Sequence, residues 1–229
     1  MKDNFLNFYN LTQRKGLINR TNQIADLLVK NEVKKLLFRP NSKPMTLELG
    51  ATQGQHLKFV QLSDHKIYVG IDIEIRQSED LSPIINLTSV HNNLVFLGGD
   101  IERLPFKSKS FDLVTSLCVF HHLLFPEKAM AEVIRVLKPG GYLVVQLPTD
   151  PGFLNQLIKR LVIFPILRKS NNSDIKLYYA RSHRNHIWAL LRQFEHILKP
   201  KGRVKVRYWP FVFPSWNFNL SVIVVFKKL

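Results

Sequence analysis

Three short segments of the chain combine glycine and acidic residues in a pattern that suits a ligand with a ribose and a purine. In the first, residues 47–54, glycines would let the backbone approach a ligand without an intervening Cβ atom. Asp72 follows about 20 residues later, at the end of the next predicted strand, where a carboxylate can accept both ribose hydroxyls. The third segment, residues 99–106, places a carboxylate and an apolar side chain where a purine could lie. A surface aspartate at a strand end remains the alternative interpretation of Asp72.

Histidines and arginines further along the chain could act on a second ligand. His121 and His122 follow a predicted strand, and histidine suits general base catalysis near neutral pH. One of the pair could be a base or could orient a substrate; the equal alternative is that both pack or cap the next helix. Arg181 and Arg184 lie three residues apart in a predicted helix, and such a pair suits phosphate or carboxylate. A solvated basic helix face is the alternative for the arginines.

Metal and disulfide chemistry find less support in the sequence. His183 and His186 have His-x-x-His spacing, but no carboxylate or cysteine lies near them in the sequence to complete a site. Cys118 is the one cysteine, which excludes an internal disulfide and a cysteine-rich zinc site. We interpret Cys118 as a small buried side chain rather than a nucleophile. No metal is therefore predicted.

An alternation of strands and helices must position these residues. Helices are predicted at 17–38, from 55 to 62, at 126–137 and near 178–198. The predicted strands span residues 45–49, 66–71, 94–97, 111–117, 142–147, 203–209 and 220–227. This alternation indicates an α/β fold, a doubly wound and mostly parallel sheet in which ligands bind beyond the carboxyl ends of the strands. No helix separates the last two strands, so they are expected to form an antiparallel hairpin at the sheet edge.

The charge divides the chain into regions. The formal net charge is +16, of which residues 1–44 carry +6 and residues 150–209 carry +10, whereas residues 45–149 carry −2. We expect a helical N-terminal arm at 1–44 and one domain at 45–229, with a basic helical insertion at about 150–200. A strong positive field favours an anionic partner such as nucleic acid, anionic lipid or a phosphorylated substrate. A basic surface without a specific partner is the alternative.

The insertion begins with an amphipathic pattern. Leu154, Leu157 and Leu161 follow helical spacing, with Lys159 and Arg160 expected on the polar side. This helix could bury its apolar face on the sheet, which is the favoured interpretation, or rest on an anionic membrane. No apolar stretch reaches the roughly 18–20 residues needed to span a bilayer, and the N-terminus lacks a secretory signal. A cytoplasmic setting is expected, with contact to the inner membrane surface as a variant.

Taken together, the motifs closely resemble the class I S-adenosylmethionine-dependent methyltransferases, in particular the small-molecule branch related to quinone and sugar methyltransferases. The resemblance covers about residues 45–147. The matching stretches are residues 47–54, 69–72, 99–106, 110–114 and 135–144.

The resemblance implies a Rossmann-like, seven-stranded sheet with S-adenosylmethionine as cofactor. It implies that Gly50 and Gly54 line the methionine part of the cofactor, while Glu48 supports the loop. Asp72 would hold the ribose and Asp100 would accept from the adenine amine, with two isoleucines beside the ring. The implied cofactor residues are Glu48, Gly50, Gly54, Asp72, Ile73, Asp100 and Ile101. The family usually has glycine where this chain has Thr52, which would be strained if its φ is positive.

The predicted reaction is O- or N-methylation of a small or lipid-linked anionic acceptor, such as an activated sugar, a glycan intermediate or a lipid. His121 and His122 would face the methyl group. An RNA methyltransferase would explain the charge directly. However, the sequence shows no separate RNA-binding module and no Asn/Asp-Pro-Pro-aromatic tetrad, so nucleic acid is the less favoured partner. Thr52 also leaves open a non-catalytic, cofactor-binding subunit with the same fold.

Overall fold

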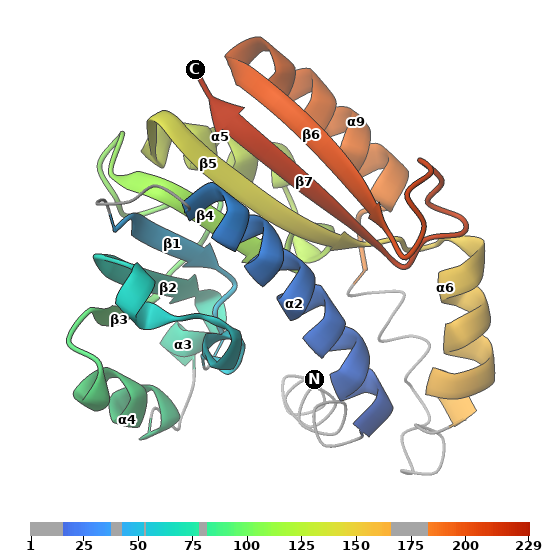
Figure 1. Ribbon diagram of the computed structural model, residues 1–229, viewed down its shortest axis with the longest axis horizontal. Coiled ribbons are helices and arrows are strands. Elements are labelled where there is room, and N and C mark those ends of the chain that lie inside the picture. The colour runs from blue at the N-terminus through green and yellow to red at the C-terminus, as the bar shows by residue number, and fades with distance from the viewer. Residues whose placement is uncertain (1–15, 38–42, 53, 78–81, 166–182) are drawn as a thin grey trace.

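The structure is a computed structural model that describes residues 16–37, 43–52, 54–77, 82–165 and 183–229. The described residues form one twisted sheet of seven strands in the order β3-β2-β1-β4-β5-β7-β6, shown in Figure 1. The strands are β1 (Met45–Leu49), β2 (Ile67–Asp72), β3 (Leu94–Gly98), β4 (Phe111–Leu117), β5 (Leu137–Pro148), β6 (Gly202–Trp209) and β7 (Ser221–Lys228). The first five are parallel, and β7 runs antiparallel to both β5 and β6. The predicted fold class and its terminal hairpin are confirmed.

Helices cover both faces of the sheet, with α2 on the near side and α5 on the far side in Figure 1. In β1, Leu47 and Leu49 face one layer while Thr46 and Glu48 face the other, because successive side chains of a strand alternate. The helices are α2 (Gly16–Leu37), α3 (Ile73–Gln77), α4 (Ser82–Val90), α5 (Pro126–Val136), α6 (Phe153–Ile158) and α9 (Ile187–Leu198). Every described helix is too short or too polar to cross a bilayer.

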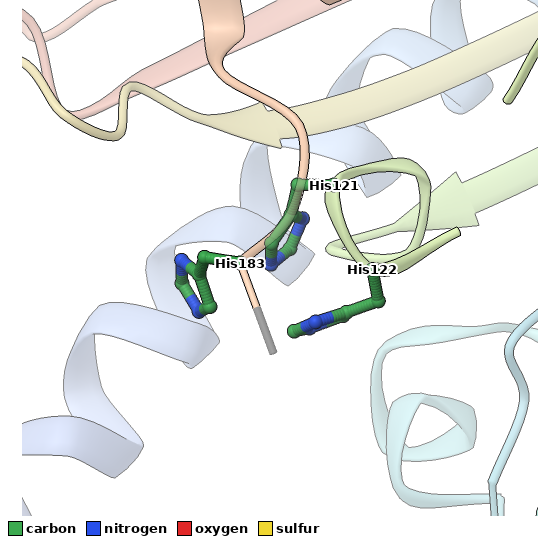
Figure 2. A group of neighbouring side chains, drawn as sticks. All are labelled: His121, His122 and His183. Atoms are coloured by element: carbon green, nitrogen blue, oxygen red, sulfur yellow. The ribbon is translucent and has the colours of Figure 1, made fainter. Parts of the chain in front are cut away.

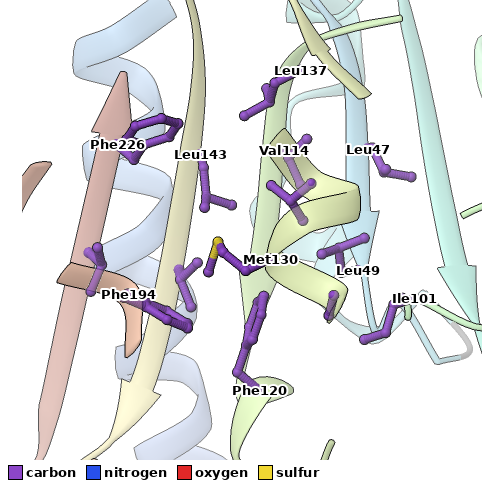
Figure 3. Close-up of a cluster of buried hydrophobic side chains, with 14 of the residues drawn as sticks. Leu47, Leu49, Ile101, Val114, Phe120, Met130, Leu137, Leu143, Phe194 and Phe226 are labelled. Carbon is purple, nitrogen blue, oxygen red and sulfur yellow. The ribbon is translucent and has the colours of Figure 1, made fainter. Parts of the chain in front are cut away.

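The main core lies between the sheet and the layer of α5 and α9. Figure 3 shows Met130 of α5 and Phe194 of α9 packed against Leu143 of β5, and all three side chains are fully buried. On the opposite face, Val29 of α2 packs against strand residues that include Val144. The helix of the predicted N-terminal arm is therefore part of the same packed unit as the sheet.

The segment after the glycine-containing turn differs from its prediction. A helix was expected from residue 55 to residue 62, but the chain forms two short 3-10 turns, η1 (Gln55–Phe59) and η2 (Leu62–Asp64). Val60 between them is extended, as its β-branched side chain favours. Leu57 packs into a small cluster with Tyr68 and Leu94. This local packing outweighs the helical spacing of the sequence.

The predicted helix near residues 178–198 also needs correction. Residues 178–182 lie outside the described residues, and His186 has an extended backbone, so α9 begins only at Ile187. Arg184 therefore precedes the helix, and Arg181 lies outside the described residues. The prediction that Arg181 and Arg184 share one helical face is therefore wrong for Arg184, which is not in a helix.

Candidate active site

The turn after β1 has left-handed backbone at Gly50, Thr52 and Gly54, with φ of 76°, 47° and 76°. A Cβ atom at Gly50 would lie 2.2 Å from a methyl carbon of Val119, so the turn packs directly against the chain leaving β4. Glycine at this position is required both by the backbone conformation and by this close approach. The positive φ of Thr52 confirms the strain that its residue type predicted.

Asp72 joins this turn to the end of β2. Its carboxylate accepts hydrogen bonds from the backbone amides of Thr52 and Glu74, each at 2.9 Å. An ionised carboxylate can accept about four hydrogen bonds, so these two leave capacity for the hydroxyls of a ribose. Asp72 is only half-buried, which leaves it accessible to a ligand.

The other predicted cofactor residues occupy different environments. Ile73 begins α3 with half of its surface exposed, and Asp100 is exposed after β3, so both can meet a ligand. Ile101 is buried in the main core, so its side chain packs in the interior. Glu48 is buried on the α2 side of the sheet, where it accepts a hydrogen bond from the Tyr68 hydroxyl at 2.9 Å, and burial raises its pKa.

Residues of α5 hold the loop that carries Asp100, and the sequence analysis gave neither Glu132 nor Arg135 this role. Glu132 accepts a hydrogen bond from the Leu104 amide at 2.8 Å. Arg135 donates to the carbonyl oxygens of Leu104 and Phe106 at 3.0 and 2.6 Å, while it also pairs with Glu132. Arg135, the first residue of the matching stretch 135–144, therefore stabilises the loop formed by the matching stretch 99–106.

Three histidines gather beyond the carboxyl end of β4. His121 and His122 belong to η3 (Phe120–His122), and His183 comes from the segment before α9, as Figure 2 shows. Their ring centroids are 3.8 Å apart for His121 and His122, 4.5 Å for His121 and His183, and 5.2 Å for His122 and His183. His121 is buried and His122 is exposed. Burial, together with the neighbouring histidines and Lys159, lowers the pKa of His121 well below its ordinary value, so it is neutral at pH 7.

Asp150, just beyond β5, supports this histidine cluster. Its carboxylate bonds to Nδ1 of His183 at 2.7 Å and forms an ion pair with the buried Lys159. Burial alone would raise the pKa of Asp150, but the bonds from His183 and Lys159 hold it at about 2. The carboxylate missing from the sequence neighbourhood of His183 is therefore supplied from 33 residues earlier. The sequence analysis expected no carboxylate near His183; this is correct for the neighbouring residues of the sequence but wrong for the folded chain.

Backbone hydrogen bonds fasten the two histidine segments together. The amides of Arg184 and Asn185 both donate to the carbonyl oxygen of His121, at 2.9 and 3.1 Å. The Asn185 side chain donates to the carbonyl oxygens of Phe120 and Leu123 at 3.2 and 2.8 Å. The histidine positions are thus set by the main chain rather than by ring contacts alone. Arg184 itself is exposed beside them.

The predicted polar side of the insertion helix is wrong at Lys159, which is 6% exposed, whereas Leu161 is 64% exposed. Residues two apart on a helix point in nearly opposite directions, so turning Lys159 inward to Asp150 turns Leu157 and Leu161 outward. Phe153 lies one turn before Leu157 and is 62% exposed.

A second exposed apolar segment adjoins this helix. The amides of Phe153 and Leu154 donate to Asn217, which fixes α6 against the chain between β6 and β7. Phe211, Phe213 and Phe218 in that chain are each about half exposed. We call the two groups together the apolar rim: Phe153, Leu157, Leu161, Phe211, Phe213 and Phe218.

Comparisons with known proteins agree with this arrangement. A protein-family model described as a methyltransferase domain matches residues 47–145. A demethylmenaquinone methyltransferase of Renibacterium salmoninarum is 37% identical over 93 residues, which cover 38% of this chain and 39% of that protein. The ubiquinone/menaquinone biosynthesis C-methyltransferase UbiE of Stutzerimonas stutzeri is 35% identical over 105 residues, 42% of this chain and 40% of that protein. The chain thus matches about two fifths of the length of these curated relatives.

Solved structures show the same fold over more of the chain. A Thermotoga maritima protein described as an S-adenosylmethionine-dependent methyltransferase, possible histamine N-methyltransferase, has a TM-score of 0.62 and 20% identity, over 99% of this chain and 97% of that chain. The CurJ carbon methyltransferase has a TM-score of 0.65 and 18% identity, over 96% of this chain and 58% of that chain. At these identities the similarity establishes the fold.

The sheet order and the acidic strand ends define a Rossmann-like methyltransferase fold. Residues 47–145 match the methyltransferase-domain family, and their similarity to quinone methyltransferases supports a class I S-adenosylmethionine-dependent methyltransferase. The described residues fit this cofactor, because Asp72 and Asp100 follow the ends of the neighbouring strands β2 and β3, where the Gly99 amide donates to the Asp72 carbonyl oxygen at 3.1 Å, and Ile73 beside Asp72 is half exposed. Carboxylates and an exposed apolar side chain are the groups that the hydroxyls, amine and ring of an adenosine would require.

Proposed function

We propose that the protein transfers the methyl group of S-adenosylmethionine to an apolar, lipid-like or lipid-linked acceptor. One observation carries the acceptor class: the apolar rim adjoins the histidine cluster. Gln156 and Lys159, which lie in the helical segment that carries Phe153, Leu157 and Leu161, both bond to Asp150. Asp150 also bonds to His183, so one carboxylate connects this helical segment to the histidine cluster. Exposed apolar side chains grouped beside a site are typical of surfaces that bind apolar partners.

In this proposal the two ends of the site have separate tasks. Asp72 and Asp100 hold the adenosine part, while the turn around Gly50 faces the methionine part. Val119 packs on Gly50, and His121 and His122 follow only two and three residues later, so the histidines lie on the methyl side of the turn. When bound, S-adenosylmethionine supplies an electrophilic methyl group on a sulfonium.

Catalysis would then rest mainly on positioning the acceptor in line with the methyl group and excluding water. A hydroxyl or carbon acceptor must also lose a proton. A histidine of the cluster is suited to accept that proton near neutral pH, as proposed for His121 and His122. Because His121 is buried and neutral whereas His122 is exposed, His122 is the better placed of the pair to meet an entering acceptor.

The basic excess supports an acceptor with an anionic group. Residues 150–209 carry a net charge of +10, and the exposed Arg184 stands beside the histidine cluster. We propose that Arg184, with Arg181, attracts a phosphate or carboxylate of a lipid-linked acceptor at an anionic membrane surface. The names of similar proteins include quinone C-methyltransferases and a malonyl-[acyl-carrier protein] O-methyltransferase, and both names are compatible with a lipid-like acceptor. Sugar and glycan acceptors without a lipid become the alternative.

The decisive test is methyl transfer from tritiated S-adenosylmethionine to polar-lipid extract, sugar extract and RNA, measured in parallel. We expect label in the lipid fraction, and a loss of most of it when Phe153, Leu157 and Leu161 are all changed to serine. Ile85→Ser on α4, equally exposed but outside the rim, is the matched control and should retain activity. Label in RNA or in sugar alone would overturn the acceptor class. Cofactor binding without transfer to any fraction would favour the non-catalytic subunit.

Membrane contact is tested separately by co-sedimentation with vesicles. Vesicles that contain anionic lipid should retain the wild-type protein at low salt and release it as salt rises, because exposed charges are screened beyond about 8 Å at physiological ionic strength. Changing Arg181 and Arg184 to Glu should weaken this retention and raise the Michaelis constant for the acceptor while leaving cofactor affinity unchanged. Equal sedimentation with neutral and anionic vesicles would exclude the proposed role of the charge.

A further inference from the structure

We propose that His121, His122 and His183 form a binding site for a divalent transition metal beside the position of the methyl acceptor. Each residue offers one ring nitrogen, and these three nitrogens lie within 4.8 Å of one another (Figure 2). Three histidine ligands with a fourth position left open are typical of catalytic zinc sites. Only the catalytic role of such a metal rests on the proposed function; the binding site rests on geometry.

Asp150 prepares one of the ligands. Since its carboxylate is bonded to Nδ1 of His183, a metal at this site would bind His183 through Nε2. A carboxylate behind a histidine ligand fixes the orientation of the ring and raises its basicity, and such partners accompany most histidine ligands of protein metal sites. The ion pair with Lys159 holds this carboxylate in place.

His121 provides a second, independent indication. Its Nδ1 atom is buried and has no hydrogen-bond partner in the described part of the chain, which is a costly state for a polar atom. A metal ion bound at this nitrogen would supply the missing partner.

The site requires only a small adjustment. With Zn–N bonds of about 2.0–2.1 Å, the nitrogens of a tetrahedral site lie roughly 3.3 Å apart, so the rings must close by about 1 to 1.5 Å. The main chains of His121 and His183 are tied by the amides of Arg184 and Asn185, so these two ligands are already preorganised. His122 is exposed and can complete the site by turning its side chain.

The donor set selects among metals. Imidazole nitrogen suits zinc, copper, nickel and iron, whereas calcium and magnesium prefer oxygen ligands. Zn²⁺ is the best match, since it accepts three histidines and an open fourth position without a geometric preference of its own. At that fourth position the metal could hold an acceptor oxygen and lower its pKa, which would replace a general base for a hydroxyl or enol acceptor.

The test uses the full chain without a polyhistidine tag, stripped with chelator and titrated with Co²⁺ and then Zn²⁺. Tetrahedral Co²⁺ gives visible absorption, so a spectrum reports the geometry as well as the stoichiometry. We expect one metal per chain, displacement of Co²⁺ by Zn²⁺, and a 10- to 100-fold weaker affinity for Asp150→Asn. His122→Ala should lower the affinity at least as far, and because His122 is exposed this variant should fold normally.

His186→Ala is the matched control, because His186 is exposed, lies three residues from His183 and is outside the cluster. This variant should bind metal like the wild type. Absence of stoichiometric binding by the wild type, or an equal loss in the His186 and His122 variants, would overturn the metal site. If chelator-treated protein binds no metal but still binds S-adenosylmethionine and transfers methyl groups, the metal proposal fails while the proposed function stands.

Discussion

The backbone amide of Thr52 donates a hydrogen bond at 2.9 Å to the Asp72 carboxylate, and thereby ties the turn after β1 to the end of β2. The same carboxylate is the proposed ribose acceptor. The Asp72 side chain therefore stabilises the left-handed turn and is also proposed to bind the cofactor. These two roles can be separated only by measuring both the free energy of unfolding and the cofactor affinity of Asp72 variants.

Asp72→Ala should weaken S-adenosylmethionine binding about 10- to 100-fold, because charge-assisted hydrogen bonds typically contribute about 1.5–3 kcal/mol. Isothermal titration calorimetry measures the affinity, and circular dichroism checks the fold. Asp64→Ala, an exposed aspartate on η2, should leave the affinity unchanged. Unchanged affinity in a folded Asp72 variant would rule out the assigned cofactor site.

Thr52→Gly should raise the free energy of unfolding by about 0.5–1 kcal/mol, because relief of the strain at φ 47° exceeds the entropy cost of glycine. Cofactor affinity should be preserved or improved. Gly50→Ala should act in the opposite direction, since its Cβ would meet Val119 at 2.2 Å. A clear loss of cofactor binding in Thr52→Gly would instead show that the threonine side chain contacts the ligand.

Arg135→Lys should lower both stability and cofactor affinity although it retains the positive charge. Lysine cannot bond simultaneously to the carbonyl oxygens of Leu104 and Phe106, so the loop that carries Asp100 loses its anchor. We expect a loss of about 1–2 kcal/mol in the free energy of unfolding, measured by urea titration. Arg192→Lys on the exposed surface of α9 is the control, and an equal effect in both variants would contradict the anchoring role.

His65 should make stability depend on pH. Burial lowers its pKa from 6.5 to about 4, and its Nδ1 lies 2.8 Å from the Thr46 hydroxyl. Between pH 6.5 and pH 4 the unfolded chain binds a proton there that the folded chain does not, so stability falls as the pH falls through this window. From pH 7 to pH 5 the loss should be about 2 kcal/mol. His65→Gln should remove this part of the pH dependence; identical slopes in the two proteins would contradict the assignment.

The strands were predictable because each is a short apolar run bounded by a clear turn. β1 and β4 begin and end at the predicted residues, and the hairpin of β6 and β7 followed from the lack of a helix between them. The positions of the glycine turn, Asp72 and Asp100 at the strand ends were also predictable, since they follow directly from those strands, while their contacts with the cofactor stay predictions. Local patterns are sufficient where the function depends on the backbone at a strand end.

The histidine cluster was only half predictable. His121 and His122 follow β4 directly, but His183 reaches them through a tertiary contact with Asp150 that no local spacing encodes. The exposure of Leu157 and Leu161 was missed for the same reason, because a single buried ion pair, Lys159 with Asp150, decides which face of this helical segment turns inward. A signal did exist: Asp150 stands just beyond β5, at the sheet end where the other acidic residues lie.

The position of β6 at the edge of the sheet has a consequence for the behaviour of the protein in concentrated solution. Arg203 and Lys205 project exposed from this strand, and Arg207 is half exposed while it pairs with Glu32 of α2. An unpaired strand edge is a template for joining two copies, and basic side chains along it oppose such joining by mutual repulsion. Part of the positive charge therefore serves colloidal stability. Neutralising these side chains should promote self-association even where cofactor binding and methyl transfer are untouched.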